Sequence, residues 1–162
     1  MTNQVLLQAS TPLRERAAMI LVNAMKPLYF YMRRDRKVWS VTQEELGQMP
    51  TGTLGKDLYN FLNANGLTLM PRAEFHDVHH VLFRFGTTMQ DETTIQFVSL
   101  GNGRYTIPHI ITNIVSVVFY PEHWGMYMDA FKLGRSANKF HDWDFETMLR
   151  IQTTEVRRMI GI

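Results

Sequence analysis

Two histidines and two carboxylates are spaced along one stretch of the sequence in a pattern that can hold a metal ion. His76 and His80 are four residues apart, so on a helix both rings project from one face, one turn from each other. Asp77 can reach that face too, whereas Glu92 must come from the next element, after a break at 86–88. Imidazole nitrogens and carboxylate oxygens bind zinc, iron and other divalent metals. The sequence therefore predicts one divalent metal at these four residues, zinc first, with iron or manganese as alternatives.

A histidine pair on a helix also has a purely structural interpretation, because this spacing is common by chance. Helical phase, at about 100° per residue, bears on the choice. The apolar stripe that must face the core consists of Phe75, Val78, Leu82 and Phe85. His76 and His80 lie away from this stripe, which favours the metal. His79 lies at its edge, and we expect it to be partly buried with a backbone partner rather than a ligand.

The elements that would position these residues are helical in their periodicity. The motif helix is expected from about Glu74 to Phe85, ended by Gly86, and Glu92 lies early in a helix that runs to the turn at 101–103. Further helices are expected at 11–28, 53–65, 107–119, 121–131 and 146–159. Pro27 should kink or restart the first of these. The segment 107–119 is rich in strand-forming residues, but its length favours a buried helix.

These patterns predict an all-α fold, a single-domain helical bundle spanning residues 1–162. The absence of cysteine excludes disulfides, thiolate metal sites and a cysteine nucleophile. A formal charge of +2 gives no reason to expect nucleic acid as a partner. The basic run at 33–37 is interpreted first as a solvated helix end, and alternatively as a contact for anionic lipid headgroups.

No transmembrane span is expected. The longest apolar run, at 107–120, is interrupted by polar residues and is shorter than the roughly 20 residues that a span requires. The first residues lack the charged start and apolar core of a secretory signal, and they do not look like an organelle transit peptide. The expected location is the bacterial cytoplasm.

Residues in and around the motif resemble one family. The pattern H-D-x-x-H followed by eleven residues and E resembles the metal motif of the protein four of coenzyme Q (ubiquinone) biosynthesis. Three other segments are similar to that family: Met49–Gly55 with Tyr59, Phe61 and Leu62, Phe131–Ala137 with Asp142 and Trp143, and the ending Glu155–Ile162. The similarity covers most of the chain and is weakest over the first forty residues.

The resemblance implies an all-helical bacterial member of that family that forms a homodimer, carries one metal and has an apolar groove for a polyprenyl lipid or quinone precursor. It implies a protein peripherally associated with the membrane, on the matrix side of the inner mitochondrial membrane in eukaryotes, and in contact with other quinone-biosynthesis enzymes. The implied activity is metal-dependent removal of the C1 carboxylate of a polyprenylated 4-hydroxybenzoate, with hydroxylation at that carbon in oxidative versions. The alternative is a non-catalytic scaffold that presents polyprenyl lipids, with a structural metal.

The sequence departs from the family after the motif. Phe83 and Arg84 stand where the family more often has a threonine-glycine pair. Arg84 follows His80 by four residues, so continued helix would place it beside the metal face, where it would clamp a substrate anion or neutralise Asp77. Phe83 would narrow the groove. The other residues expected to line the groove are Tyr105, Trp124 and the segment 107–119, although core packing explains them equally well.

Overall fold

Every regular element in the described residues, which are 13–32, 34 and 37–162, is a helix in the computed structural model. The α-helices are α2 (Leu13–Met32), α3 (Gln43–Gly47), α4 (Leu54–Ala64), α5 (Glu74–Phe83), α6 (Met89–Gly101), α7 (Ile107–Phe119), α8 (Trp124–Ser136) and α9 (Thr153–Ile160). Two short 3₁₀ turns are η1 (Pro121–His123) and η2 (Phe145–Met148). The all-α prediction is confirmed.

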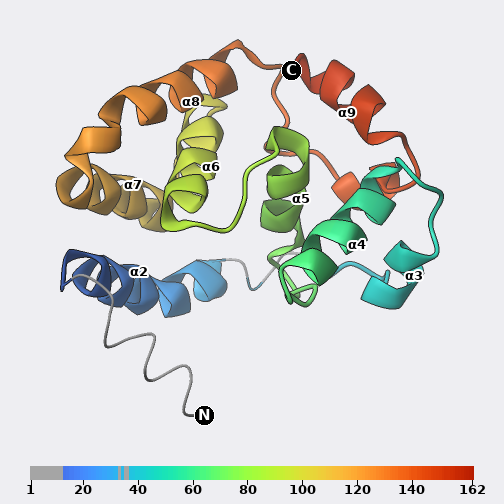
Figure 1. The fold of residues 1–162 in the computed structure, drawn as a ribbon, viewed down its shortest axis with the longest axis horizontal. Coiled ribbons are helices and arrows are strands. Elements are labelled where there is room, and N and C mark those ends of the chain that lie inside the picture. The colour runs from blue at the N-terminus through green and yellow to red at the C-terminus, as the bar shows by residue number, and fades with distance from the viewer. Residues whose placement is uncertain (1–12, 33, 35–36) are drawn as a thin grey trace.

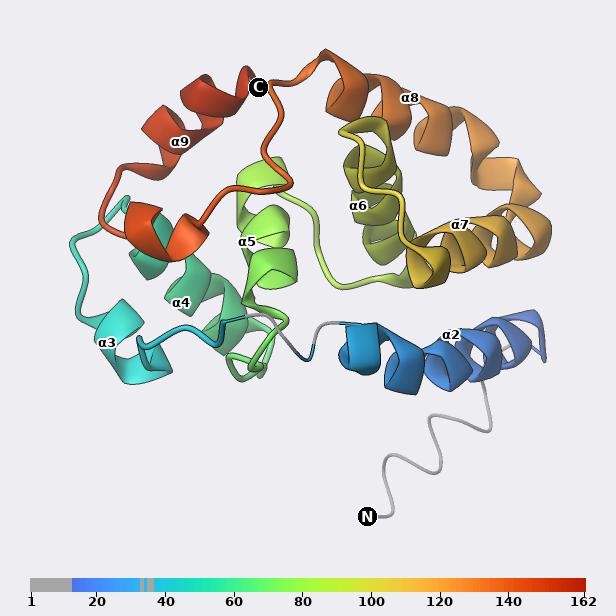
Figure 2. The ribbon, with the colours of Figure 1, turned by 180° about the vertical axis from the view of Figure 1, so that it is seen from behind.

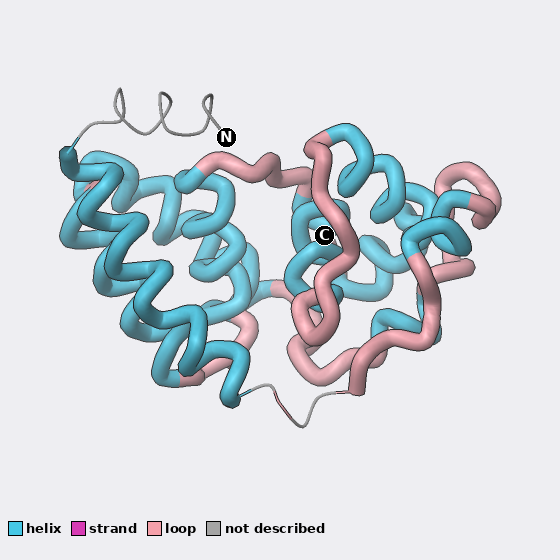
Figure 3. The backbone as a smooth tube through the Cα atoms, turned by 90° about the horizontal axis from the view of Figure 1, so that it is seen from below, coloured by secondary structure: helices cyan, strands magenta, loops and turns pink. Residues whose placement is uncertain are grey.

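The helices form two groups with α5 between them (Figure 1). One group contains α3, α4, α9 and the turn η2, and the other contains α2, α6, α7 and α8, an arrangement that is also clear from behind (Figure 2). Seen from below, α2 and α7 lie side by side (Figure 3). The metal-motif helix α5 therefore stands where the groups meet.

The group around α4 buries its apolar residues in the usual way. Fully or almost fully buried aliphatic side chains on α3, α4 and α9 are Leu46, Leu54, Leu58, Leu62, Val156 and Ile160. Thr53 caps α4, and two N–H groups at the start of that helix, those of Leu54 and Gly55, donate to the carbonyl oxygens of Ile151 and Leu149 at 2.9 and 2.8 Å. The segment before α9 thus satisfies donors that a free helix end leaves unpaired.

The other group depends on a close crossing of α6 and α8. A side chain at Gly101 would collide with the backbone carbonyl of Phe131, and one at Gly134 would collide with that of Val98. Beside this crossing the fully buried Asn102 donates to the carbonyl oxygens of Gly134 and Asn138, both at 3.0 Å. Two glycines and one amide therefore set how closely these helices approach.

The structure confirms the predicted helix at 107–119, but the prediction that this helix is buried is wrong. Its apolar residues Ile107, Ile110, Ile114 and Val118 are 63, 41, 57 and 68% exposed. Its buried residues are Pro108, His109, Asn113 and Ser116. His109 Nε2 donates to the Gln96 carbonyl oxygen at 2.7 Å, and the hydroxyls of Ser116 and Thr93 lie 3.0 Å apart. The helix turns its polar side toward α6, so apolarity alone misled the prediction.

Two other helix boundaries differ from expectation. The helix expected at 146–159 is divided, because the chain passes from η2 through an extended segment before α9. Gln152 in that segment forms an isolated antiparallel bridge with Thr53, so pairing with another part of the chain outweighs local helix preference there. The expected restart at Pro27 is absent, since α2 continues through it.

The start expected at Thr11 and Pro12 lies outside the described residues, as do three members of the basic run, Arg33, Asp35 and Arg36. Of the other two, the Arg34 guanidinium lies 4.1 Å from the centre of the Tyr31 ring, and Lys37 pairs with Glu146 at 2.7 Å. No helix within the described ranges is both long enough and apolar enough to cross a bilayer.

Candidate metal site

The motif residues are positioned by α5, by the turn after it and by the first turn of α6. His76 and His80 lie one turn apart on α5, and Glu92 lies in the first turn of α6. Thr88 begins α6 as part of a capping box with Asp91, in which the Thr88 hydroxyl accepts from the Asp91 N–H and the Asp91 carboxylate accepts from the Thr88 N–H. The expected break at 86–88 is confirmed, and it brings Glu92 back to the histidine face of α5.

The donor atoms of three residues converge at this point. The distance from His76 Nε2 to Glu92 Oε2 is 2.9 Å, from His80 Nε2 to Glu92 Oε1 3.4 Å, and between the two Nε2 atoms 3.1 Å. A metal held at about 2.0–2.2 Å by each donor separates them by about 2.8–3.6 Å in tetrahedral or octahedral geometry. The donor set and its spacing therefore fit a zinc, iron or manganese ion, and His76, His80 and Glu92 are the residues that could hold it.

His80 is held from two sides. Its Nδ1 lies 2.7 Å from the carbonyl oxygen of Gly86, so it must carry the proton and donate, which leaves the Nε2 lone pair for a metal. The Phe61 ring, from α4, stacks on the imidazole with ring centres 4.9 Å apart and planes 20° from parallel. Gly86 follows His80 by only six residues, so its contact with His80 is a local one that the sequence could suggest. No signal in the sequence pointed to Phe61.

The site is open on one side. The His80 side chain is 3% exposed, whereas those of His76 and Glu92 are 22 and 37% exposed. His80 therefore lies at the closed end and the other two donors at the open end. A cluster of three donors with an accessible side leaves positions for water or a substrate oxygen, as catalytic metal sites do.

The charges of the site depend on one another. Burial raises the pKa of Glu92, but hydrogen bonds with His76 and His80 outweigh it and lower this pKa to about 2. Burial lowers the pKa of His80, but the Glu92 carboxylate and the Gly86 carbonyl outweigh it and the pKa rises above its ordinary value. The site is thus arranged to stabilise a cation.

Asp77, the fourth predicted ligand, lies beside the cluster rather than in it. The group of converging donors in the described chain comprises His76, His80 and Glu92. Burial raises the pKa of Asp77 to about 6, opposed by the two histidines, so its charge lies close to theirs. Asp77 is therefore close to the three donors, but it does not belong to the group whose donor atoms converge.

His79 is not among the three donors, in line with the sequence interpretation, but it is more buried than expected. It is 1% exposed and lies between aromatic rings, including Phe75 at 4.3 Å and Phe140 at 5.3 Å between ring centres. Its Nδ1 lies 3.5 Å from the Ser99 hydroxyl. This histidine therefore joins α5 to the aromatic core.

The predicted lipid residues occupy different environments. Phe83 is buried against His79 and Phe140. Tyr105 and Trp124 are 66 and 49% exposed, so their assignment to a groove remains a prediction. Arg84 ends α5 in the left-handed conformation, with φ 57°, so helical phase no longer places it one turn beyond His80. Burial is the larger of two causes that lower the pKa of Arg157, and the nearby positive charge of Arg84 is the other.

The chain is thus an all-α protein with a two-histidine, one-glutamate cluster suited to a divalent metal. No protein-family model and no curated protein matches its sequence. Its fold is shared by the "putative ubiquinone biosynthesis protein" of Nostoc punctiforme, with a TM-score of 0.60 and 20% sequence identity over 89% of this chain and 80% of that one. At this identity the similarity is one of fold.

Proposed function

We propose that this chain is a metal-dependent enzyme of ubiquinone or related quinone biosynthesis that removes the C1 carboxyl group from a polyprenylated 4-hydroxybenzoate. The observation that carries the proposal is the convergence of three metal donors with an open side at His76 and Glu92. A fold shared with the Nostoc punctiforme protein adds support. The proposed setting is the bacterial cytoplasm, at a membrane surface.

A bound divalent ion would act as a Lewis acid and stabilise negative charge on a substrate oxygen. The chain's own residues would do the rest. His80, fixed by Gly86 and Phe61, sets the closed end of the site, and the substrate approaches past the more exposed His76 and Glu92. In the simple reaction the ring–carboxylate bond breaks, carbon dioxide leaves and a proton takes its place. In the oxidative version a hydroxyl group takes that place, and the two electrons lost by the substrate reduce dioxygen, so that substrate, water and dioxygen give the hydroxylated ring, carbon dioxide and hydrogen peroxide.

Metal content tests the proposal first. Protein purified without chelator should contain one equivalent of zinc, or alternatively of iron or manganese, by elemental analysis. Glu92→Ala removes one of three donors and should lose most of the metal, since loss of a ligand weakens binding strongly. Glu44→Ala, at an exposed carboxylate on α3, is the matched control and should keep it. Metal-free wild-type protein, or equal metal in all three proteins, would overturn the proposed site.

Turnover separates the enzyme from a protein with a structural metal. Wild-type protein given substrate labelled in its carboxyl group should release labelled carbon dioxide. His80→Ala should stay folded and abolish release if the metal is catalytic, whereas unfolding on loss of the metal indicates a structural role. A hydroxylated product would identify the oxidative reaction.

A second candidate function is a scaffold that presents polyprenyl lipids to other quinone-biosynthesis enzymes, and the outward apolar face of α7 favours it. This α7 face consists of Ile107, Ile110, Ile114 and Val118. Clustered apolar side chains on a helix surface suit the interfacial region of a bilayer. A second copy of the chain is the other proposed occupant, and analytical ultracentrifugation without lipid would reveal a homodimer.

Vesicle binding tests the α7 face. Ile114→Ser combined with Val118→Ser removes two apolar side chains from it and should weaken binding to lipid vesicles about tenfold or more, given about 0.8 kcal/mol per buried methylene group. Leu67→Ser, at a 41% exposed leucine outside that face, is the control. Equal vesicle binding by both variants would exclude α7 as the membrane contact.

A further inference from the structure

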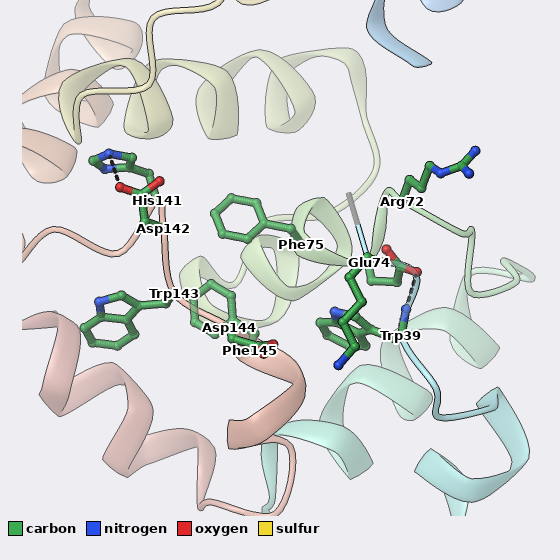
Figure 4. Close-up of a pocket in the computed structure, with 10 residues that line it drawn as sticks. Trp39, Arg72, Glu74, Phe75, His141, Asp142, Trp143, Asp144 and Phe145 are labelled. Atoms are coloured by element: carbon green, nitrogen blue, oxygen red, sulfur yellow. Dashed lines mark hydrogen bonds and ion pairs between the residues drawn. The ribbon is translucent and has the colours of Figure 1, made fainter. Parts of the chain in front are cut away.

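A pocket lies at the start of α5, where Glu74 and Phe75 line it and none of the metal donors does (Figure 4). Its volume is about 260 Å³. Three segments far apart in the sequence line it: the connection before α3, the turn and first residues of α5, and the loop at 141–145 between α8 and η2. This volume is below the roughly 300–1,000 Å³ of pockets for drug-sized ligands, so any ligand is small.

The buried charge of this pocket is the Glu74 carboxylate. Glu74 is 4% exposed. Its Oε1 accepts the backbone N–H of Trp39 at 3.3 Å, a long hydrogen bond, and Oε2 accepts none from the described part of the chain. A buried carboxylate normally has several donors or a cation beside it, because leaving it unpaired costs several kcal/mol. Glu74 therefore retains acceptor capacity inside the pocket.

Aromatic rings form the remaining inner wall. Trp143 and Phe145 have ring centres 6.0 Å apart, and those of Phe145 and Phe75 are 5.4 Å apart, so the three rings follow one another (Figure 4). Trp39 lies next to Glu74. Arg104, which is not among the lining residues, lies 5.2 Å from the centre of the Phe75 ring. Aromatic faces, tryptophan above all, attract cations.

The cationic side chains that line the pocket lie at its rim. Lys37 is 71% exposed and its ammonium group is held by Glu146 at 2.7 Å. Arg72 is exposed as well. The acidic side chain of Asp142 is 87% exposed and pairs with His141 at 3.0 Å. The buried carboxylate of Glu74 with Trp39 beside it provides the chemistry that recognises an organic cation rather than an anion.

We propose that this pocket binds a small primary ammonium ion, which donates hydrogen bonds to Glu74 and places its alkyl chain against Trp39. An ammonium group has three N–H donors and can donate a hydrogen bond to Oε2 of Glu74. The charge-assisted hydrogen bond and the cation–aromatic contacts act together in a partly desolvated place, where each is stronger than in water. None of the three metal donors lines the pocket, so binding should not need the metal.

Titration of the full chain with n-butylammonium and with 1-butanol, its neutral counterpart of similar size, tests this proposal. At pH 7 the amine is protonated, and saturable change in tryptophan fluorescence or in backbone amide shifts of the pocket residues should occur with n-butylammonium only. Glu74→Gln should weaken binding by about tenfold or more, the loss of one charge-assisted hydrogen bond. Glu44→Gln, on the exposed surface of α3, should leave it unchanged.

Trp39→Leu provides a second variant that leaves the carboxylate in place. It should weaken n-butylammonium binding by about threefold or more through loss of the aromatic face. The proposal is wrong if 1-butanol binds as well as the amine, or if affinity is unchanged in the folded Glu74→Gln or Trp39→Leu protein. The titration should also be repeated in the presence of a chelator. Amine binding should persist without metal, which distinguishes binding in this pocket from binding at the metal site.

Discussion

The two groups of helices on either side of α5 distribute apolar residues in opposite ways. Around α4 the leucines are inside: Leu54 and Leu58 are completely buried. On α7 the isoleucines are outside: Ile107 and Ile114 are 63 and 57% exposed, while His109 and Asn113 are buried. Both helices are amphipathic, yet only one uses its apolar side for the core.

This difference shows that an apolar stripe on a helix predicts a surface suited to burial. It does not say whether the chain's own core or another molecule buries that surface. The α4 stripe is covered by the chain itself. The polar side of α7 is satisfied by hydrogen bonds with α6, such as the one from His109 to Gln96, so that helix stays in place with its apolar side outward. Exposed aliphatic side chains are a source of binding free energy, about 25 cal/mol per Å² of apolar area removed from water.

The largest expected effect is on the free energy of unfolding, and it should differ between the two groups of helices. Leu58→Ala creates a cavity in the core and should lower the free energy of unfolding by about 2–5 kcal/mol. Ile114→Ala removes a side chain that is 57% exposed and should change it by no more than about 0.5 kcal/mol. Chemical denaturation of both variants and the wild type measures this. A large loss in Ile114→Ala would mean that the α7 face is already covered in the free protein.

A smaller, pH-dependent effect is expected where Lys37 and Ser40, which precede α3, contact Glu146 in η2. Glu146 accepts hydrogen bonds from Lys37 at 2.7 Å and from the N–H and hydroxyl of Ser40 at 2.5 and 2.7 Å. Lys37 first, and then Ser40, lower the pKa of Glu146 from 4.5 to about 2. Since the folded pKa is below the unfolded one, the carboxylate stabilises the fold above pH 4.5, and this contribution is lost as the pH falls toward 2.

Glu146→Gln should therefore lower stability at pH 7 by about 1–3 kcal/mol, the scale of hydrogen bonds to charged groups. Thermal unfolding from pH 7 down to pH 3 should show the two proteins approaching each other below pH 4.5. A difference in stability that is constant across this range would show that the charge of Glu146 does not matter. Glu44→Gln is the matched exposed control.

The smallest expected effect lies in the turn that joins the groups between α5 and α6. Arg84 has φ 57°, a left-handed conformation that disfavours side chains and favours glycine at a helix C-terminus. Arg84→Gly should raise the free energy of unfolding by about 0.5–1 kcal/mol in chemical denaturation. Unchanged or lower stability would indicate that the arginine side chain makes compensating contacts. If Arg84 also clamps a substrate anion, the same variant should bind that anion more weakly.

Much of the candidate site could be predicted because its determinants are local. The spacing of His76 and His80 fixes their common face through the helical repeat, and Thr88 with Asp91 starts the next helix at the position that returns Glu92. Asp77 shows the limit of the same reasoning. Sequence spacing says which residues share a face, but the direction of a side chain within that face depends on its neighbours, and Asp77 stays outside the converging donors.

The sequence by itself determined the all-α class, the approximate positions of most helices and three residues that could hold a metal, because helix periodicity, caps and turns act over a few residues. Only the tertiary structure decided that α7 faces outward, that residues 149–152 leave the helix to pair with the start of α4, and that Phe61 stacks on His80. It also brought Trp39, Glu74 and Trp143 into one pocket. These features join segments far apart in the chain, and no local pattern specifies which buried partner a side chain will meet.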